Sequence, residues 1–508
     1  MKRIAWLVAS SLGVLGLANL PVACVSSTAA APGDEDSGVP QGGDSGPQGN
    51  DATVPPGEDA ATSDAGVDTG VDAGPQPLTL RVLLGGAPEP GVSVVFQDAT
   101  GTALTTATTG ATGTVSQLVT AGSQVTVVLG TQRNPNLVTI QDVAPGDVLT
   151  VTDTSTSPTP IDDEVTTTLP ASTWDAAAVS EVVYAGQCSD PVAYPLYLGT
   201  NCESAGQFPL FARAVDNTTQ VEVAYTYQTG NALVPDGGLP DGDTTLPVVV
   251  TRAWSTSTAT ETVTGTNVPP LPVGAQGGYV TQVYAEVSGG VPLSLLGSDA
   301  TTDDAGAQSA QFVIHTGYPD FVQAGAYTTV STESGNVISI VGGATRSAPP
   351  TTSQSASFDL STLPLITSAT VDANDGGIPG QPNVTWTSAG SLSAANGIYV
   401  SAQWNAEVAT DAGSVSVNGT WTLVAPPTAT SVQAPALPAS LAAWSPGATA
   451  SWNSTPRVAA VQASFLSGYA GFRAQAGSLP LMSGYAIVVP TLPVNGTIYV
   501  SGIYPDEG

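Results

Sequence analysis

The sequence has very few of the residues that enzymes most often use for catalysis. Its 508 residues include one histidine, and Lys2 is the only lysine. One histidine excludes zinc sites built from several imidazoles, and the near absence of lysine excludes Schiff-base chemistry and the Gly-Lys-Ser/Thr phosphate loop. His315 lies in the apolar run Phe312–Thr316 without a Gly-x-Ser-x-Gly elbow elsewhere, so we expect a packed or surface histidine. The prediction is a chain without catalytic residues.

Basic residues are scarce as well. Nine lysines and arginines stand against 41 acids, so the formal net charge is −32. Such a chain repels the phosphates of nucleic acids, and we expect no nucleic-acid partner. The acids are scattered along the sequence. This favours solubility outside the cell over a dedicated cation site.

The N-terminus has the pattern of a secretion leader. A positive start at Met1–Arg3 precedes the apolar stretch Ile4–Leu20, which is too short and too close to the end for an ordinary membrane span. Cys24 follows a small residue, Ala23. We therefore expect residues 1–23 to be removed on export.

The sequence around Cys24 resembles the lipobox of bacterial lipoproteins. The resemblance implies that Cys24 becomes the first residue and carries acyl chains, which anchor a protein stably when several are present. Pro21 stands where leucine is more usual, so cleavage by the ordinary signal peptidase is the alternative. Val25, in place of aspartate, favours the outer membrane by the sorting rule of this family. We therefore expect the protein to associate with the membrane through its lipid anchor alone.

The sequence has three cysteines, so two remain for a disulfide if Cys24 carries lipid. Cys188 and Cys202 bracket a segment with two prolines. In an oxidising compartment we expect a disulfide between them, which stabilises by about 3 kcal/mol for a loop of this length. Two cysteines and one histidine are too few for a metal site of their own.

Residues 24–77 contain almost no apolar side chains. Aspartate, glycine, proline and serine dominate, as in Asp34–Gly38 and Asp72–Pro75. Low hydrophobicity with net negative charge does not offset the entropy of ordering, so we expect a disordered acidic tether. Treated as a flexible chain it reaches on the order of 40 Å, enough to hold a domain away from a membrane.

A period-two pattern begins at Leu78, where alternate apolar residues predict a strand. Strands and glycine turns then recur through residue 152 in the rhythm of a small β-sandwich. The segment Pro90–Val94, a Gly turn, a Thr-rich strand, Gly113 and the late strand Val148–Val151 together resemble the carboxypeptidase regulatory-like, transthyretin-like fold. In that family the module is a non-catalytic sandwich. The resemblance therefore implies no active site for residues 78–152.

Strand patterns continue to the C-terminus, so we expect a mainly β protein with tandem β-sandwich domains after the signal peptide and tether. We divide the remainder into β-rich domains at 153–350 and 351–508. Residues 365–404 resemble an immunoglobulin or fibronectin-type sandwich. Helix is expected only from Ser172 through Glu181, and 458–473 is ambiguous between helix and strand. The clearest further strands are expected at Val221–Tyr227, Tyr279–Val287, Asn336–Val341, Trp421–Val424, Tyr485–Val489 and Thr497–Gly502.

Three sets of residues are candidates for chemistry. Asp372, Asn374 and Asp375 are the best of several weak Ca²⁺ candidates, although Asp and Asn beside Gly are also standard turn residues. A carboxylate pair for glycoside hydrolysis would come from Asp175, Glu181, Glu203, Glu222 and Glu286. Six tryptophans are candidates for sugar stacking, with core packing the favoured alternative: Trp254, Trp386, Trp404, Trp421, Trp444 and Trp452.

These features favour a lipid-anchored, non-enzymatic envelope protein at the outer membrane. Its sandwiches are expected to serve adhesion, envelope assembly or the capture of a protein or glycan ligand, without a cofactor. The alternative is an exported carbohydrate-binding protein or a glycoside hydrolase that works with two carboxylates.

Overall fold

The structure is a computed structural model. It describes residues 76–505 apart from 85, 154–162, 176, 186–187, 190–195, 199–206, 220, 233–244, 270–275, 288–290, 302–306, 319, 332–336, 349–350, 373–379, 411–412, 448–449, 454 and 476–491. The leader, Cys24, the tether through residue 75, Cys202 and the expected strand Tyr485–Val489 lie outside the described residues. The disulfide to Cys188 therefore stays a prediction.

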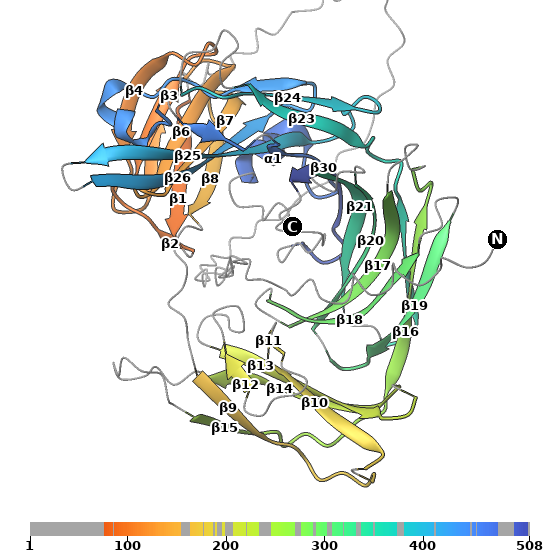
Figure 1. Cartoon of the computed structure of the whole chain (residues 1–508). Coiled ribbons are helices and arrows are strands. Elements are labelled where there is room, and N and C mark those ends of the chain that lie inside the picture. Colours follow the sequence, from red (N-terminus) through yellow and green to blue (C-terminus); the bar gives the residue numbers. More distant parts are fainter. Residues whose placement is uncertain are drawn as a thin grey trace, which may run out of the picture.

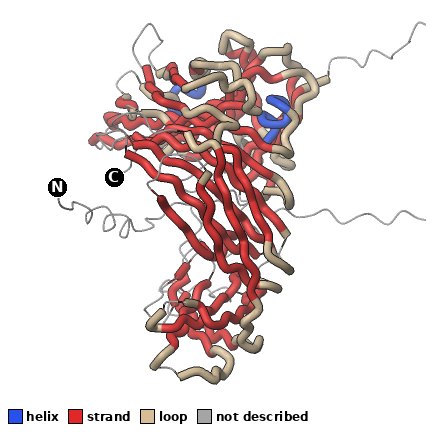
Figure 2. Tube along the Cα trace, turned by 90° about the vertical axis from the view of Figure 1, so that its right-hand side faces the viewer, coloured by secondary structure: helices blue, strands red, loops and turns tan. Residues whose placement is uncertain are grey.

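Strands make up most of the described chain, which confirms the mainly β prediction. One sheet of 13 strands runs through the molecule, and its elements lie side by side in Figures 1 and 2. β28 (Ser451–Trp452) pairs with β25 beside this path. In spatial order the other strands are β18 (Val291–Thr301), β17 (Gln276–Val287), β20 (Phe321–Ser331), β21 (Val337–Ser347), β30 (Thr497–Pro505), β29 (Arg457–Ala463), β25 (Gly397–Thr410), β26 (Gly413–Ala425), β7 (Pro135–Val143), β6 (Ser123–Gly130), β3 (Ser93–Gln97) and β4 (Ala103–Thr108).

Three smaller sheets pack against the two faces of this large sheet. One core lies under the first: Leu80 of β1 and Val151 of β8 are buried with Phe96 and Val125 of the large sheet. The other core joins the second and third sheets to β17, β20, β25 and β26. The sheets are β1 (Leu78–Leu84) with β2 (Ala87–Pro88), β5 (Thr114–Gln117) and β8 (Val148–Asp153); β16 (Thr258–Thr266) with β19 (Gln308–His315) and β22 (Gln354–Asp359); and β23 (Ile366–Asp372) with β24 (Asn383–Ser388) and β27 (Ser431–Gln433).

Two further sheets form what we call the lower lobe, at the bottom of Figure 1. Their facing side chains share a core that includes Val183, Phe208, Leu210 and Val248. The sheets are β10 (Val179–Ala185) with β11 (Cys188–Ser189), β13 (Gln207–Asp216) and β14 (Glu222–Ala232), and β9 (Asp163–Thr168) with β12 (Leu196–Leu198) and β15 (Thr245–Val249).

Strands from all three expected domain ranges join the large sheet. β7 pairs in parallel with β26, from Asn136 beside Thr420 to Ile140 beside Val424. Across this seam the indole Nε1 of Trp421 donates to Thr139 Oγ1 at 2.9 Å, and both side chains are fully buried. The division at residues 152 and 350 stays a prediction, but backbone hydrogen bonds connect the parts that it separates.

The ambiguous segment 458–473 contains both kinds of structure. β29 (Arg457–Ala463) is followed by the short helix α1 (Gly468–Gln475), and a 3-10 turn, η1, spans Ala439–Trp444. Arg473 of α1 is buried, and its guanidinium lies 2.8 Å from the carboxylate of Asp147. This ion pair fixes the helix against the start of β8. Along the residues that the structure describes, we find no helix with the length and hydrophobicity of a membrane span.

The expected helix at Ser172–Glu181 is wrong. Asp175 accepts the backbone N–H of Ala177 at 2.9 Å and closes a turn, after which β10 begins at Val179. An Asp side chain caps turns as readily as helices, and the branched residues that follow favour a strand.

Candidate functional site

The calcium candidates do not come together as a metal site in the described structure. Asp372 ends β23 and pairs with Asn383, whereas Asn374 and Asp375 lie outside the described residues. Within the part of the chain that the structure describes, no three His, Cys, Asp or Glu residues come together as a metal-ligating group. Glu203 and the side chain of Glu286 also lie outside the description.

The tryptophans pack in the interior. Trp386, Trp404 and Trp421 are buried in one core, and Trp452 packs beside Trp404 with ring centroids 5.4 Å apart. Trp444 is partly buried against the same core. Trp254 meets Trp174 edge to face at 4.8 Å in the lower lobe. For the buried tryptophans, the favoured alternative of core packing is confirmed.

His315 is the last residue of β19 and lies where this strand meets the lower lobe. Its Nε2 is 2.5 Å from Oε1 of Glu222, a residue of β14 in the lower lobe. The ring centroids of Tyr225 and Phe211 lie 4.3 Å and 5.0 Å from the imidazole. We call these four residues, with Tyr318 stacked on Phe211, the joint.

Hydrogen bonds from tyrosines reinforce the joint. The hydroxyl of Tyr225 is shared between the carbonyl oxygens of Ser257, at 2.9 Å, and Thr316, at 2.6 Å. Tyr227 donates to the carbonyl of Gly317, and Arg252 lies 4.0 Å above its ring. Burial raises the pKa of Tyr227, and also that of Tyr318, so both phenols keep their protons at neutral pH.

The joint serves structure better than catalysis. The side chain of His315 is 3% exposed, so a substrate has no direct approach to the imidazole. Its one charged partner is already engaged, and the surrounding rings supply packing rather than a nucleophile. Of the two expected alternatives, a packed or a surface histidine, the structure shows the packed one, and His315 holds β14 against β19.

We expect His315→Ala to weaken this attachment by about 3 kcal/mol. The substitution strands the carboxylate of Glu222, which is 18% exposed, and opens a void between aromatic rings. Glu222→Gln keeps a hydrogen bond to the ring and should cost less. Denaturant unfolding measures both, with Val313→Ala on the exposed face of β19 as the control. A His315→Ala protein as stable as wild type would contradict the role.

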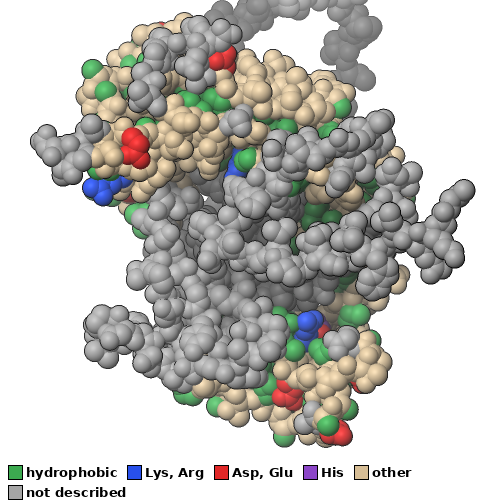
Figure 3. All heavy atoms as spheres, viewed as in Figure 1, with side chains coloured by type: hydrophobic (Ala, Val, Ile, Leu, Met, Phe, Trp, Pro, Cys, Tyr) green, Lys and Arg blue, Asp and Glu red, His purple; other side chains and the backbone are tan. Residues whose placement is uncertain are grey.

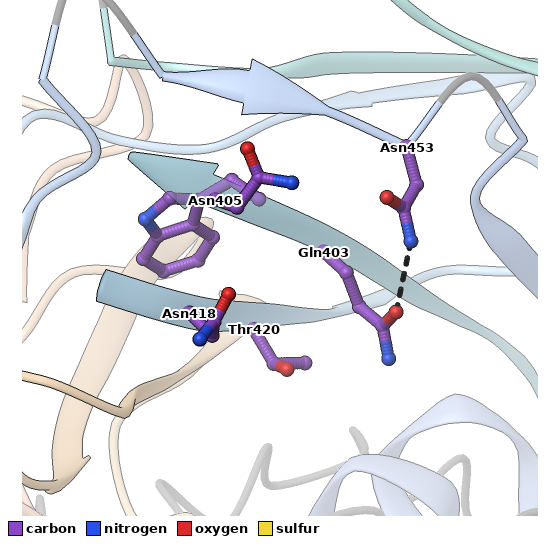
Figure 4. A pocket seen from close by; sticks show the side chains of 7 residues that line it. Gln403, Asn405, Asn418, Thr420 and Asn453 are labelled. Atoms are coloured by element: carbon purple, nitrogen blue, oxygen red, sulfur yellow. Dashed lines mark hydrogen bonds between the residues drawn. The ribbon is translucent and has the colours of Figure 1, made fainter. Parts of the chain in front are cut away.

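A second candidate site is a polar pocket of about 270 Å³ on β25 and β26 (Figure 4). The register pairs Gln403 with Thr420 and Asn405 with Asn418. Residues paired in this way point to the same face of the sheet, so the four side chains form one patch. Asn453, next to β28, completes it. We call these five residues the amide pocket.

One pair of amides in the pocket is held in place. Asn453 donates from its backbone N–H to the carbonyl of Gln403 at 3.0 Å, and from its Nδ2 to Oε1 of Gln403 at 2.9 Å. Both bonds cross between the same two residues, as the dashed line in Figure 4 shows for the side chains. Among the described residues, neither Nε2 of Gln403 nor Oδ1 of Asn453 has a further hydrogen-bond partner, so both groups can bind a ligand.

A rigid wall lies beneath the amides. The indole of Trp404 is 3% exposed and lies across Gly419, where an added Cβ would come within 2.0 Å of the ring. Gly419 is therefore required by packing. Because the ring is buried, it supports the pocket without offering a face for stacking.

The sequence indicates Trp404 as a candidate, but it does not indicate the amide side chains at the neighbouring positions. A signal existed in the alternation of polar Gln403 and Asn405 with apolar neighbours, and again in Asn418 and Thr420. Two such strands make a site only when their register aligns them. That register was not readable from the separate strands.

Comparisons with known proteins return little. No family model matches the chain, and no curated protein matches it in sequence. The TIE protein of Bacillus anthracis is 11% identical with a TM-score of 0.15, over 56% of this chain and 50% of that one, so the match spans half of its length. The fimbrial anchor protein Mfa2 of Porphyromonas gingivalis is 11% identical with a TM-score of 0.14, over 35% and 80%.

A third solved structure, described as an adhesin from Bacteroides ovatus, is 9% identical with a TM-score of 0.10 over 52% of this chain and 76% of that one. All three similarities are distant. At such scores they carry no argument about this chain, and its function rests on its own residues.

Proposed function

We propose that this chain is a lipid-anchored, non-enzymatic surface protein of a bacterial outer membrane. The observation that carries the proposal is the order of its parts. An apolar leader ends at Cys24, a polar acidic stretch follows, and β1 opens a strand-rich body at Leu78. This order suits a body displayed at a distance from the membrane.

The charge of the chain supports a role outside the cell. On the face shown in Figure 3, the acidic side chains lie apart from one another and only a few basic ones are visible. Scattered negative charge keeps a protein soluble and apart from anionic surfaces. Attachment to a membrane would then depend on acyl chains rather than on the body.

The architecture supports a binding role. Hydrogen bonds join the first sandwich to the C-terminal strands, and α1 braces that seam through Arg473 and Asp147. A connected body of this kind holds a surface in fixed orientation. His315 and Glu222, the pair with the most reactive chemistry in the joint, are engaged in packing.

Replacing the anchoring residue tests the proposal. We expect wild-type protein in the detergent-extractable membrane fraction and Cys24→Ala in the soluble fraction, because the body has no other anchor in this account. Ser27→Ala, three residues downstream, is the matched control and should behave as wild type. Membrane association that survives Cys24→Ala would overturn the anchor, and hydrolysis of any member of a polysaccharide panel would overturn the non-enzymatic role.

A further inference from the structure

We infer that the amide pocket binds a single sugar unit without net charge. The inference deepens the proposed surface role by naming the ligand class, and it rests on that role for the ligand's extracellular setting. It begins from the chemistry of the five residues of the amide pocket. Gln403, Asn405, Asn418, Thr420 and Asn453 are all uncharged, in a chain whose net charge is −32.

An uncharged lining of this kind selects against charged ligands. An anionic ligand finds no lysine or arginine in the pocket and meets the negative field of the whole protein. A cation finds no carboxylate among the lining residues. A neutral ligand loses the least free energy on entering, because the amides take over the hydrogen bonds that it makes to water in solution.

The hydrogen-bonding groups match hydroxyls better than other neutral groups. Each primary amide has two donor hydrogens and one acceptor oxygen, and the hydroxyl of Thr420 has both functions. Adjacent hydroxyls on a sugar ring likewise donate and accept. The bonded pair of Gln403 and Asn453 presents a fixed set of such groups, so less side-chain entropy is lost on binding.

The size of the pocket limits the ligand. Its volume of about 270 Å³ is below the roughly 300 Å³ at which pockets for drug-sized molecules begin. One sugar ring suits such a volume, and a longer glycan would extend into solvent. Because Trp404 is buried, we expect recognition through amides rather than through aromatic stacking.

The test uses the full-length protein in detergent and a panel of glucose, galactose, mannose and N-acetylglucosamine, with glucuronic acid as the charged comparison. Saturation-transfer NMR identifies a binder and titration calorimetry gives its affinity. We expect at least one neutral sugar to bind and glucuronic acid to bind at least tenfold more weakly. Failure of all four neutral sugars, or a preference for the acid, would overturn the inference.

Variants locate the site. Asn405 and Asn418 are exposed, so the double variant Asn405→Ala/Asn418→Ala should fold normally and bind at least tenfold more weakly. Ser414→Ala/Ser416→Ala, on the same strand, is the matched control and should bind as wild type. Unchanged affinity in the amide variant would overturn the site. Membrane fractionation of the same variants separates this failure from that of the proposed function, which depends on Cys24 and not on the pocket.

Discussion

Ending the chain after Gly496 should abolish cooperative folding. The missing strand, β30, lies in the middle of the large sheet, hydrogen-bonded to β21 on one side and β29 on the other. Its side chains enter both main cores: Val500 faces one and Ile503 the other, and both are at most 1% exposed. Without β30, the sheet divides and both cores open.

The size of the loss follows from burial. Ile498, Val500 and Ile503 are buried, and each such side chain contributes about 1.5–3 kcal/mol. Ser501 adds a buried link, since its hydroxyl donates to the carbonyl of Pro364 at 2.6 Å and accepts the N–H of Ile366 at 3.1 Å. Together with two rows of backbone hydrogen bonds, this approaches the roughly 5–15 kcal/mol that stabilises a typical native protein.

A point substitution separates the effect of the strand from that of chain length. Val500→Asp places a carboxylate in the core and should also prevent a cooperative transition. Val494→Asp, at a side chain 42% exposed just before β30, is the matched control and should unfold as wild type. Thermal unfolding followed by circular dichroism is the measurement. A truncated chain with a wild-type transition would show that β30 is not central.

Replacing Glu261 should make the protein more stable at and above neutral pH. Glu261 points inward from β16 on the same face as Val263, and its side chain is among the buried ones at 3% exposed. Its Oε2 has no hydrogen-bond partner among the described residues. Desolvation raises the pKa of this carboxyl to about 7, from an ordinary value of 4.5.

The direction of the pH effect follows from that shift. Between pH 4.5 and 7 the folded protein keeps a proton that the unfolded chain releases, so stability falls as the pH rises through this window. Below pH 4.5 both the folded and the unfolded protein carry the proton on Glu261, so the carboxyl does not lower the stability there. Above pH 7 the loss is complete, at about 3 kcal/mol. Glu261→Gln has no proton to lose and should remove this component.

Chemical denaturation of both proteins at pH 5 and pH 8 tests the effect. The difference in unfolding free energy, Glu261→Gln minus wild type, should grow by a few kcal/mol from the lower to the higher pH. Taking this difference cancels the general repulsion among 41 acids. Glu407→Gln, at an exposed position on β25, is the control and should not alter the pH dependence. The same difference at both pH values would contradict the buried-acid account.

Local patterns predicted many strands because side-chain alternation is a property of the strand alone. The alternation from Leu78 became β1, that of Tyr279–Val287 lies within β17, and Thr497–Gly502 lies within β30. The pattern shows which face is apolar, but not which strand lies alongside. The insertion of β30 between β21 and β29, and the parallel pairing of β7 with β26, therefore could not be predicted.

The sites show the same limit. The sequence predicts a packed or surface histidine at His315, but its partner Glu222 lies 93 residues away, and the sequence indicates Glu222 only as a candidate catalytic carboxylate. The amide pocket depends on a register that sets Asn405 beside Asn418. The joint needs a contact between segments far apart in the sequence, and the amide pocket needs the hairpin register and the approach of Asn453 from 50 residues away. Composition and spacing encode neither.

The N-terminal residue of the native protein tests the central claim most directly. Mass spectrometry of protein purified from membranes should show a first peptide that begins at Cys24 and carries the added mass of acyl chains. A first peptide that begins elsewhere without lipid, or that retains Met1–Ala23, would contradict a lipid-anchored surface protein.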